Sequence, residues 1–76
     1  MKNIEKSVCL TDFGNFIREG RRRLDITQVE AAEMLGITQQ YLSLVERGER
    51  EVGINDALEM CRVLGIDLRT FISMYM

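Results

Sequence analysis

Thr27–Arg47 reads TQVEAAEMLGITQQYLSLVER, a pattern that predicts two short helices joined by a tight turn. Thr27 and Glu30 have the spacing of a capping box, in which the threonine hydroxyl accepts from the N3 amide and the glutamate reaches back to the N-cap amide. Gly36 suits the left-handed residue that ends many helices. The first helix is therefore expected to run for about two turns, with an inward stripe spaced for one helical face: Val29, Ala32 and Leu35.

The second helix is predicted to start after Thr38, a good N-cap residue, with Ile37 as the apolar plug of the turn. Leu42 and Val45 give this helix an inward stripe. The remaining side chains then face away from the core: Gln39, Gln40, Tyr41, Ser43, Leu44 and Arg47. Two helices in this arrangement form a helix-turn-helix, which usually presents its second helix to a partner.

The rest of the chain completes an all-α fold, a compact domain of five helices over residues 11–76 that follows an N-terminal arm, residues 1–10. Thr11 or Asp12 is expected to cap the first helix, in which Gly20 costs about 1 kcal/mol relative to alanine. Its predicted inward residues are Phe13, Ile17 and Leu24.

Two further helices are predicted after Gly48. The fourth runs from Ile54 to about Leu64, with glycine on either side at Gly53 and Gly65, and its apolar stripe consists of Ile54, Ala57, Leu58, Cys61 and Leu64. Asp67 is expected to cap the fifth helix, whose apolar side consists of Leu68, Phe71, Ile72 and Tyr75.

Composition argues against several classes of protein. The 76 residues include no histidine and no run of about 18 apolar residues of the kind that spans a membrane. Cys9 and Cys61 lack metal-ligand and disulfide-framework spacing, which favours a reduced, cytoplasmic setting. We expect no enzyme, metal, cofactor or small-molecule substrate, because the sequence contains neither a nucleophile constellation nor a phosphate-cradling glycine loop.

The motif residues resemble those of the lambda-repressor and Cro-like (XRE-type) helix-turn-helix domains. The shared pattern consists of Thr27, Gln28, Ala32, Gly36, Glu46, Arg47 and Gly48, within a resemblance that covers roughly Phe13–Ile72. In size and layout the chain is similar to restriction-modification controller proteins and small phage-type repressors. One departure is Asp25, where the family more often has glycine, so the first loop is expected to differ in detail.

The resemblance implies a transcriptional regulator that binds double-stranded DNA. Glutamine can pair with adenine N6 and N7, and the start of the second motif helix enters the major groove in such folds. The expected base-reading residues are Gln39, Gln40, Tyr41, Ser43 and Leu44. For the glutamines the alternative is an ordinary polar helix start; for Tyr41 it is partial packing, and for Leu44 an extension of the core.

Phosphate contacts are expected from helix N-termini and nearby basic or polar side chains: Gln28, Thr38, Arg23, Arg47 and Arg50. The resemblance further implies that Gln28 buttresses Gln39, which reads adenine. It also implies an internal ion pair between Arg21 and Glu46, so Arg21 is not counted as a DNA contact.

Ten basic and twelve acidic residues give a net charge of −2, whereas DNA-binding proteins usually carry a basic footprint. The distribution predicts a dipolar molecule, basic on one side, because arginines cluster at two places: Arg18, Arg21, Arg22 and Arg23, then Arg47 and Arg50.

A homodimer on a palindromic operator is expected, because one short helix rarely supplies enough specificity and a chain of this length buries only about 60% of its unfolded surface. The predicted dimer residues lie in the fifth helix: Phe71, Ile72, Met74 and Tyr75. Alternatively, Phe71 and Ile72 belong to the core and Met74–Met76 fray. A second reading of the whole chain is an antitoxin or other protein-interaction module on the same fold.

Overall fold

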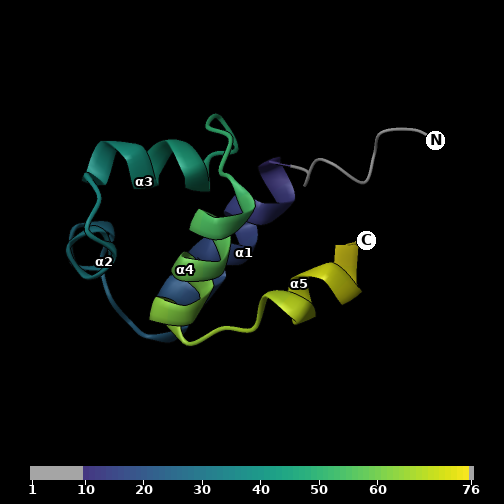
Figure 1. Ribbon diagram of the computed structural model, residues 1–76. Helices are drawn as coiled ribbons and strands as arrows, with labels where there is room; N and C mark the ends of the chain where they lie inside the picture. Colours follow the sequence, from purple (N-terminus) through teal and green to yellow (C-terminus); the bar gives the residue numbers. More distant parts are fainter. Residues whose placement is uncertain (1–9, 76) are drawn as a thin grey trace.

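The computed structural model describes residues 10–75, which form five α-helices and no strand (Figure 1). The helices are α1 (Leu10–Arg23), α2 (Gln28–Leu35), α3 (Gln39–Glu46), α4 (Ile54–Leu64) and α5 (Leu68–Tyr75). The predicted all-α, five-helix fold is therefore confirmed. Most of the predicted arm, including Cys9, and the terminal Met76 lie outside the described residues, as do the side chains of Leu10 and Tyr75.

The caps of the two motif helices follow the prediction. The Glu30 amide donates to Thr27 Oγ1 at 3.1 Å, and the Thr27 amide donates to Glu30 Oε1 at 2.8 Å, completing the capping box. Gly36 ends α2 in the left-handed region with φ 71°. At α3, the Tyr41 amide donates to Thr38 Oγ1 at 3.0 Å.

The start of α1 and the loop after it differ from expectation. The helix begins at Leu10, so Thr11 and Asp12 lie in its first turn rather than capping it, and Asp12 there complements the positive end of the helix dipole. Asp25 has φ 58°, a left-handed conformation that costs an L-residue about 1–2 kcal/mol and that glycine adopts freely. The loop therefore keeps a glycine-type conformation although its residue is aspartate.

The core lies where α1 packs against α3, α4 and α5. In Figure 1, α1 and α4 occupy the middle of the molecule, with α2 and α3 to the left and α5 to the right. The Phe71 ring lies 5.6 Å from that of Phe13 and 5.2 Å from that of Phe16, measured between centroids. These contacts fix α5 against α1.

Several predicted inward residues are exposed, because the buried stripes are rotated from those predicted. In α2 the buried residues are Ala31 and Ala32. In α4 the buried residues share one helical face and are Ala57, Met60, Cys61 and Leu64. The inward assignments were wrong for four apolar side chains, each between 45% and 59% exposed: Leu24, Val29, Ile54 and Leu58.

Two glycines of α1 allow neighbouring segments to approach closely. A Cβ at Gly14 would lie 2.3 Å from the Val45 carbonyl oxygen and 2.7 Å from that of Glu46. A Cβ at Gly20 would lie 2.8 Å from the Ile66 side chain. The backbone of α1 thus touches the C-terminal turn of α3, and Gly20 has a packing role besides its helix-propensity cost.

Candidate nucleic-acid interface

The outward face of α3 begins with two exposed glutamines, Gln39 and Gln40. Behind them Leu42 and Val45 are buried and hold the helix to the core. The other predicted base-reading side chains, Tyr41, Ser43 and Leu44, are half-buried. The structure therefore leaves the front of α3 most available to a ligand.

The N-termini of α2 and α3 supply backbone donors beside this face. Each of these eight-residue helices has a threonine N-cap whose hydroxyl accepts from the third amide of the helix. The amides before it have no intrahelical acceptor, and they carry the positive end of the helix dipole. Thr38 still has its hydroxyl hydrogen free to donate. These ends suit an anion such as a phosphate.

Beneath the interface lies the carboxylate of Glu46, only 2% of whose surface is exposed. Arg21 binds it with two parallel hydrogen bonds, Nε to Oε2 at 2.7 Å and Nη2 to Oε1 at 3.0 Å. The structure thus contains the ion pair that the sequence implied. Arg21 also donates through Nη1 to the Ile26 carbonyl at 3.0 Å, tying the α1–α2 loop to the same site.

Gln28 connects this ion pair to α3. Its Nε2 donates to Glu46 Oε1 at 3.0 Å, and its Oε1 accepts from Gln39 Nε2 at 3.3 Å. Both ends of the Gln28 amide are therefore engaged inside the protein, which leaves one N–H for a phosphate. The buttressing of Gln39 by Gln28 is present without DNA.

Burial of Glu46 disfavours its charged form, but the hydrogen bonds from Arg21 and Gln28, together with the positive charges of Arg21 and Arg18, outweigh that cost. The pKa of Glu46 consequently lies below its usual value of 4.5. The carboxylate is ionised at neutral pH and can only accept hydrogen bonds.

Arg18 makes a structural contact that the sequence did not reveal. Its Nη2 donates to the Glu46 carbonyl at 2.8 Å, at the C-terminal end of α3, and its Nε lies 3.7 Å from Glu46 Oε1. The predicted arginine cluster is therefore divided: Arg18 and Arg21 bind Glu46, whereas Arg22 and Arg23 are exposed at the end of α1. The sequence spacing of Arg18 does not indicate a contact with the Glu46 carbonyl, which lies far away along the chain.

The arginines after α3 lie near its outward face. The Arg50 guanidinium sits 5.3 Å from the centre of the Tyr41 ring, a cation–π distance. Arg47 donates from Nε to the Ser43 carbonyl at 3.4 Å and approaches Glu49. Both arginines are exposed, whereas Arg23 lies apart from these contacts at the last residue of α1.

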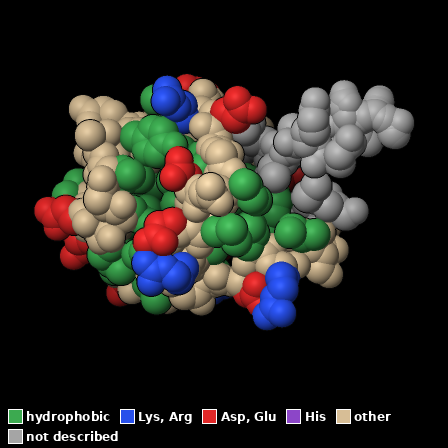
Figure 2. Space-filling model, viewed as in Figure 1, with side chains coloured by type: hydrophobic (Ala, Val, Ile, Leu, Met, Phe, Trp, Pro, Cys, Tyr) green, Lys and Arg blue, Asp and Glu red, His purple; other side chains and the backbone are tan. Residues whose placement is uncertain are grey.

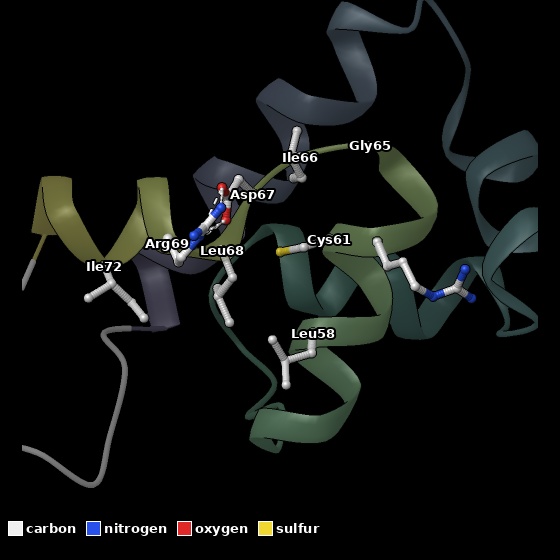
Figure 3. A pocket seen from close by; sticks show the side chains of 9 residues that line it. Leu58, Cys61, Gly65, Ile66, Asp67, Leu68, Arg69 and Ile72 are labelled. Atoms are coloured by element: carbon white, nitrogen blue, oxygen red, sulfur yellow. Dashed lines mark hydrogen bonds and ion pairs between the residues drawn. The ribbon is translucent and has the colours of Figure 1, made fainter.

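A groove between α4 and α5 is a second surface feature. Figure 3 shows Leu58 on α4 facing Leu68 and Ile72 on α5, with Cys61 at its floor. Hydrophobic side chains also gather between these helices in Figure 2. Burial, together with the nearby Asp67 carboxylate, raises the pKa of the Cys61 thiol to about 11, so this thiol is a protonated core group.

The predicted dimer residues separate into two groups at this groove. Phe71 is wholly buried, which corrects its assignment as a dimer contact, because its ring is used between α1 and α5. Ile72 and Met74 are 45% and 64% exposed. The side chain of Tyr75 lies outside the described residues.

Among residues 10–75 no helix is long and apolar enough to cross a membrane. The same residues include no cluster of histidine, cysteine or acidic side chains able to hold a metal ion.

Comparison with known proteins gives consistent results. A family model described as helix-turn-helix matches residues 17–71. Over 49 residues the chain is 39% identical to an uncharacterised HTH-type transcriptional regulator of Methanothermobacter thermautotrophicus, covering 64% of this chain and 71% of that protein.

Two solved structures extend the likeness to nearly the whole fold. One is the restriction-modification controller protein C.AhdI of Aeromonas hydrophila, with a TM-score of 0.74 and 32% identity over 82% of this chain and 90% of that one. The other is the controller protein C.Esp1396I, solved as a tetramer with its natural 35-base-pair operator. Its TM-score is 0.76, with 23% identity over 91% of each chain, which is a likeness of fold.

Proposed function

Because this chain belongs to the lambda-repressor and Cro-like (XRE-type) helix-turn-helix family of transcriptional regulators, we propose that it binds a palindromic operator as a homodimer, with α3 in the major groove. Its site of action is the cytoplasm, where such an operator is accessible, and it has no enzymatic activity.

The observation that carries this proposal is the placement of Gln39. It is exposed at the first position of α3, and its side chain is held by Gln28 rather than free to rotate. A glutamine in this position can accept from adenine N6 and donate to N7, which is worth about 1–3 kcal/mol of discrimination against a wrong base. Gln40, Tyr41, Ser43 and Leu44 follow on the same helix and complete the proposed reading surface.

Binding to the DNA backbone is assigned to the groups around this surface and to Arg23 at the end of α1. The free amides of α2 and α3 face phosphates together with Gln28, Thr38, Arg23, Arg47 and Arg50. The net negative charge is compatible with this role because the ligand meets the local charge: Arg47 and Arg50 are exposed beside α3, whereas Glu46 is buried and paired with Arg21.

The second copy is proposed to bind at the α4–α5 groove, through Ile72, Met74 and Tyr75. Two features support this: large apolar side chains are exposed along both helices, and the groove between them is apolar. C.Esp1396I, which shares the fold, was solved as a tetramer on its operator. Helix-turn-helix dimers bind half-sites about 34–36 Å apart or a multiple of that distance, and we expect the same spacing in the operator of this dimer.

Paired substitutions test the DNA interface. Arg50→Ala should weaken binding to all sequences alike and reduce the log–log salt slope by about 0.9, the share of one phosphate. Gln39→Ala should instead relax the preference at one base pair. Arg22→Ala, which removes the same charge from an exposed residue of α1 that is assigned to neither the DNA surface nor the groove, is the control and should change neither quantity. If Arg50→Ala and Gln39→Ala both leave affinity and preference unchanged, α3 is not the reading helix.

A further inference from the structure

We propose that Glu46 is a positioning residue for base recognition: acting through Gln28, its carboxylate fixes which atoms of the Gln39 amide are turned toward DNA. The proposal rests on the proposed function, in which Gln39 reads a base. It adds a specificity role to a residue that never touches the ligand.

The chemistry of a carboxylate fixes the direction of the hydrogen bonds that start at Glu46. A carboxylate can only accept, so the end of the Gln28 amide that contacts Glu46 at 3.0 Å must be its NH₂ group. The carbonyl oxygen of Gln28 is thereby turned toward α3. There it accepts from Gln39 Nε2 at 3.3 Å, which fixes the orientation of the second amide as well.

The consequence is a defined pattern at the front of α3. Gln39 has one N–H directed to Gln28, so its other N–H and its carbonyl oxygen remain available to a base in the major groove of DNA. One donor beside one acceptor matches adenine, which offers an N6 donor and an N7 acceptor. Guanine offers two acceptors at N7 and O6, and the fixed Gln39 carbonyl oxygen opposes one of them.

The surroundings of Glu46 keep this direction constant. Arg21 holds both carboxylate oxygens, and Arg18 lies 3.7 Å from Oε1, so the group stays an anion with no proton to donate. Because Glu46 is only 2% exposed, water does not compete for the oxygen that Gln28 uses. The ion pair is complete without Gln28, so the bond from Gln28 is not needed to compensate the charge.

Gln28→Met separates the positioning role from a structural one. Methionine has a similar length and removes both amide bonds, but it leaves the Arg21–Glu46 pair in place. We expect the preference for adenine over guanine at the base pair read by Gln39 to fall at least about fivefold, measured by competition binding with operators changed at that pair. Preferences at the other base pairs should not change, whereas loss of a phosphate contact alone would weaken every operator equally and leave all ratios intact.

Glu46→Gln provides a second test that needs no DNA. A carboxamide can either donate or accept, so the direction of the chain is lost. We expect the side-chain amide resonances of Gln39 to shift in the NMR spectrum of the free protein, although Gln39 does not touch Glu46, and Gln28→Met should shift the same resonances. Unchanged Gln39 resonances in a folded Glu46→Gln protein would overturn the proposal.

Gln39→Ala distinguishes base reading by Gln39 from the positioning role of Glu46. If Gln39→Ala leaves the base preference intact, Gln39 is not a base reader, and both the proposed function of this residue and the positioning role are wrong. If Gln39→Ala relaxes the preference but Gln28→Met keeps it in full, base reading stands and the positioning role is overturned. The expected result is relaxation by both, with no further loss when they are combined.

Discussion

Glu46 joins three helices at a single residue. Its carboxylate accepts from Arg21 of α1 and Gln28 of α2, and its backbone carbonyl, at the end of α3, accepts from Arg18. A buried charge of this kind adds little net stability when paired but costs about 3–5 kcal/mol when its partner is removed. The residue therefore constrains how α2 and α3 are oriented on α1.

The depressed pKa of Glu46 makes a prediction about pH. A carboxyl group that releases its proton more readily when folded contributes stability above its unfolded pKa, near 4.5, and loses it as pH falls through the lower folded pKa. At neutral pH the free energy of unfolding of the unmodified protein should exceed that of the Glu46→Gln variant by about 3 kcal/mol. This gap should narrow as pH falls below 4.5, because Glu46 then takes up a proton and loses its charge. The exposed carboxylates affect both proteins equally, so the difference measured in denaturant titrations reports on Glu46; a gap independent of pH would contradict the assignment.

Among the side-chain contacts, the sequence predicted those that the family resemblance includes. The pairing of Arg21 with Glu46 and of Gln28 with Gln39 came from the family resemblance. The bond from Gln28 to Glu46 and the bond from Arg18 to a backbone carbonyl were not predicted, because they depend on how α1 lies across the end of α3. Nothing in the local spacing of these residues fixes that crossing.

Among the helices, the α1–α3 crossing depends on Gly14. Replacing Gly14 or Gly20 by alanine gains the same helix propensity, about 1 kcal/mol. At Gly14 the new methyl group meets carbonyl oxygens of α3 that cannot rotate away, whereas at Gly20 it meets the end of the Ile66 side chain. We expect Gly14→Ala to lower the free energy of unfolding by about 2 kcal/mol more than Gly20→Ala, measured in urea. Equal stabilities would show that α1 and α3 do not approach this closely.

Helix ends were predicted better than helix faces. Capping is a local interaction, so Thr27, Thr38, Gly36 and Gly65 could be identified from their neighbours. The Asp67 cap was also predicted, and its Oδ1 accepts from the Arg69 amide at 2.9 Å. Which face is buried depends on helix packing, and this explains why the exposed Val29 and Ile54 were assigned to the core.

For the molecule as a whole, the proposed dimer surface makes a separate prediction. Ile72→Glu places a charge in the α4–α5 groove and should raise the dimer dissociation constant at least about tenfold, measured by sedimentation equilibrium without DNA. Met34→Glu is the matched control, since Met34 is similarly exposed, 49% against 45%, but lies on α2. If Ile72→Glu and Met34→Glu associate like the unmodified protein, the copies do not join through this groove.

The arrangement of the helices divides the proposed roles between two parts of the molecule. In Figure 1, α2 and α3 lie on the side opposite α5, with α1 and α4 between them. DNA and a second copy would therefore contact different surfaces of one chain.

Selection of bound DNA from a random pool tests most directly whether this chain reads sequence through α3. The expected product is a two-fold symmetric site with half-sites one helical turn or a multiple apart, containing an adenine whose enrichment disappears in Gln39→Ala. Weak binding with no enriched sequence would contradict the account.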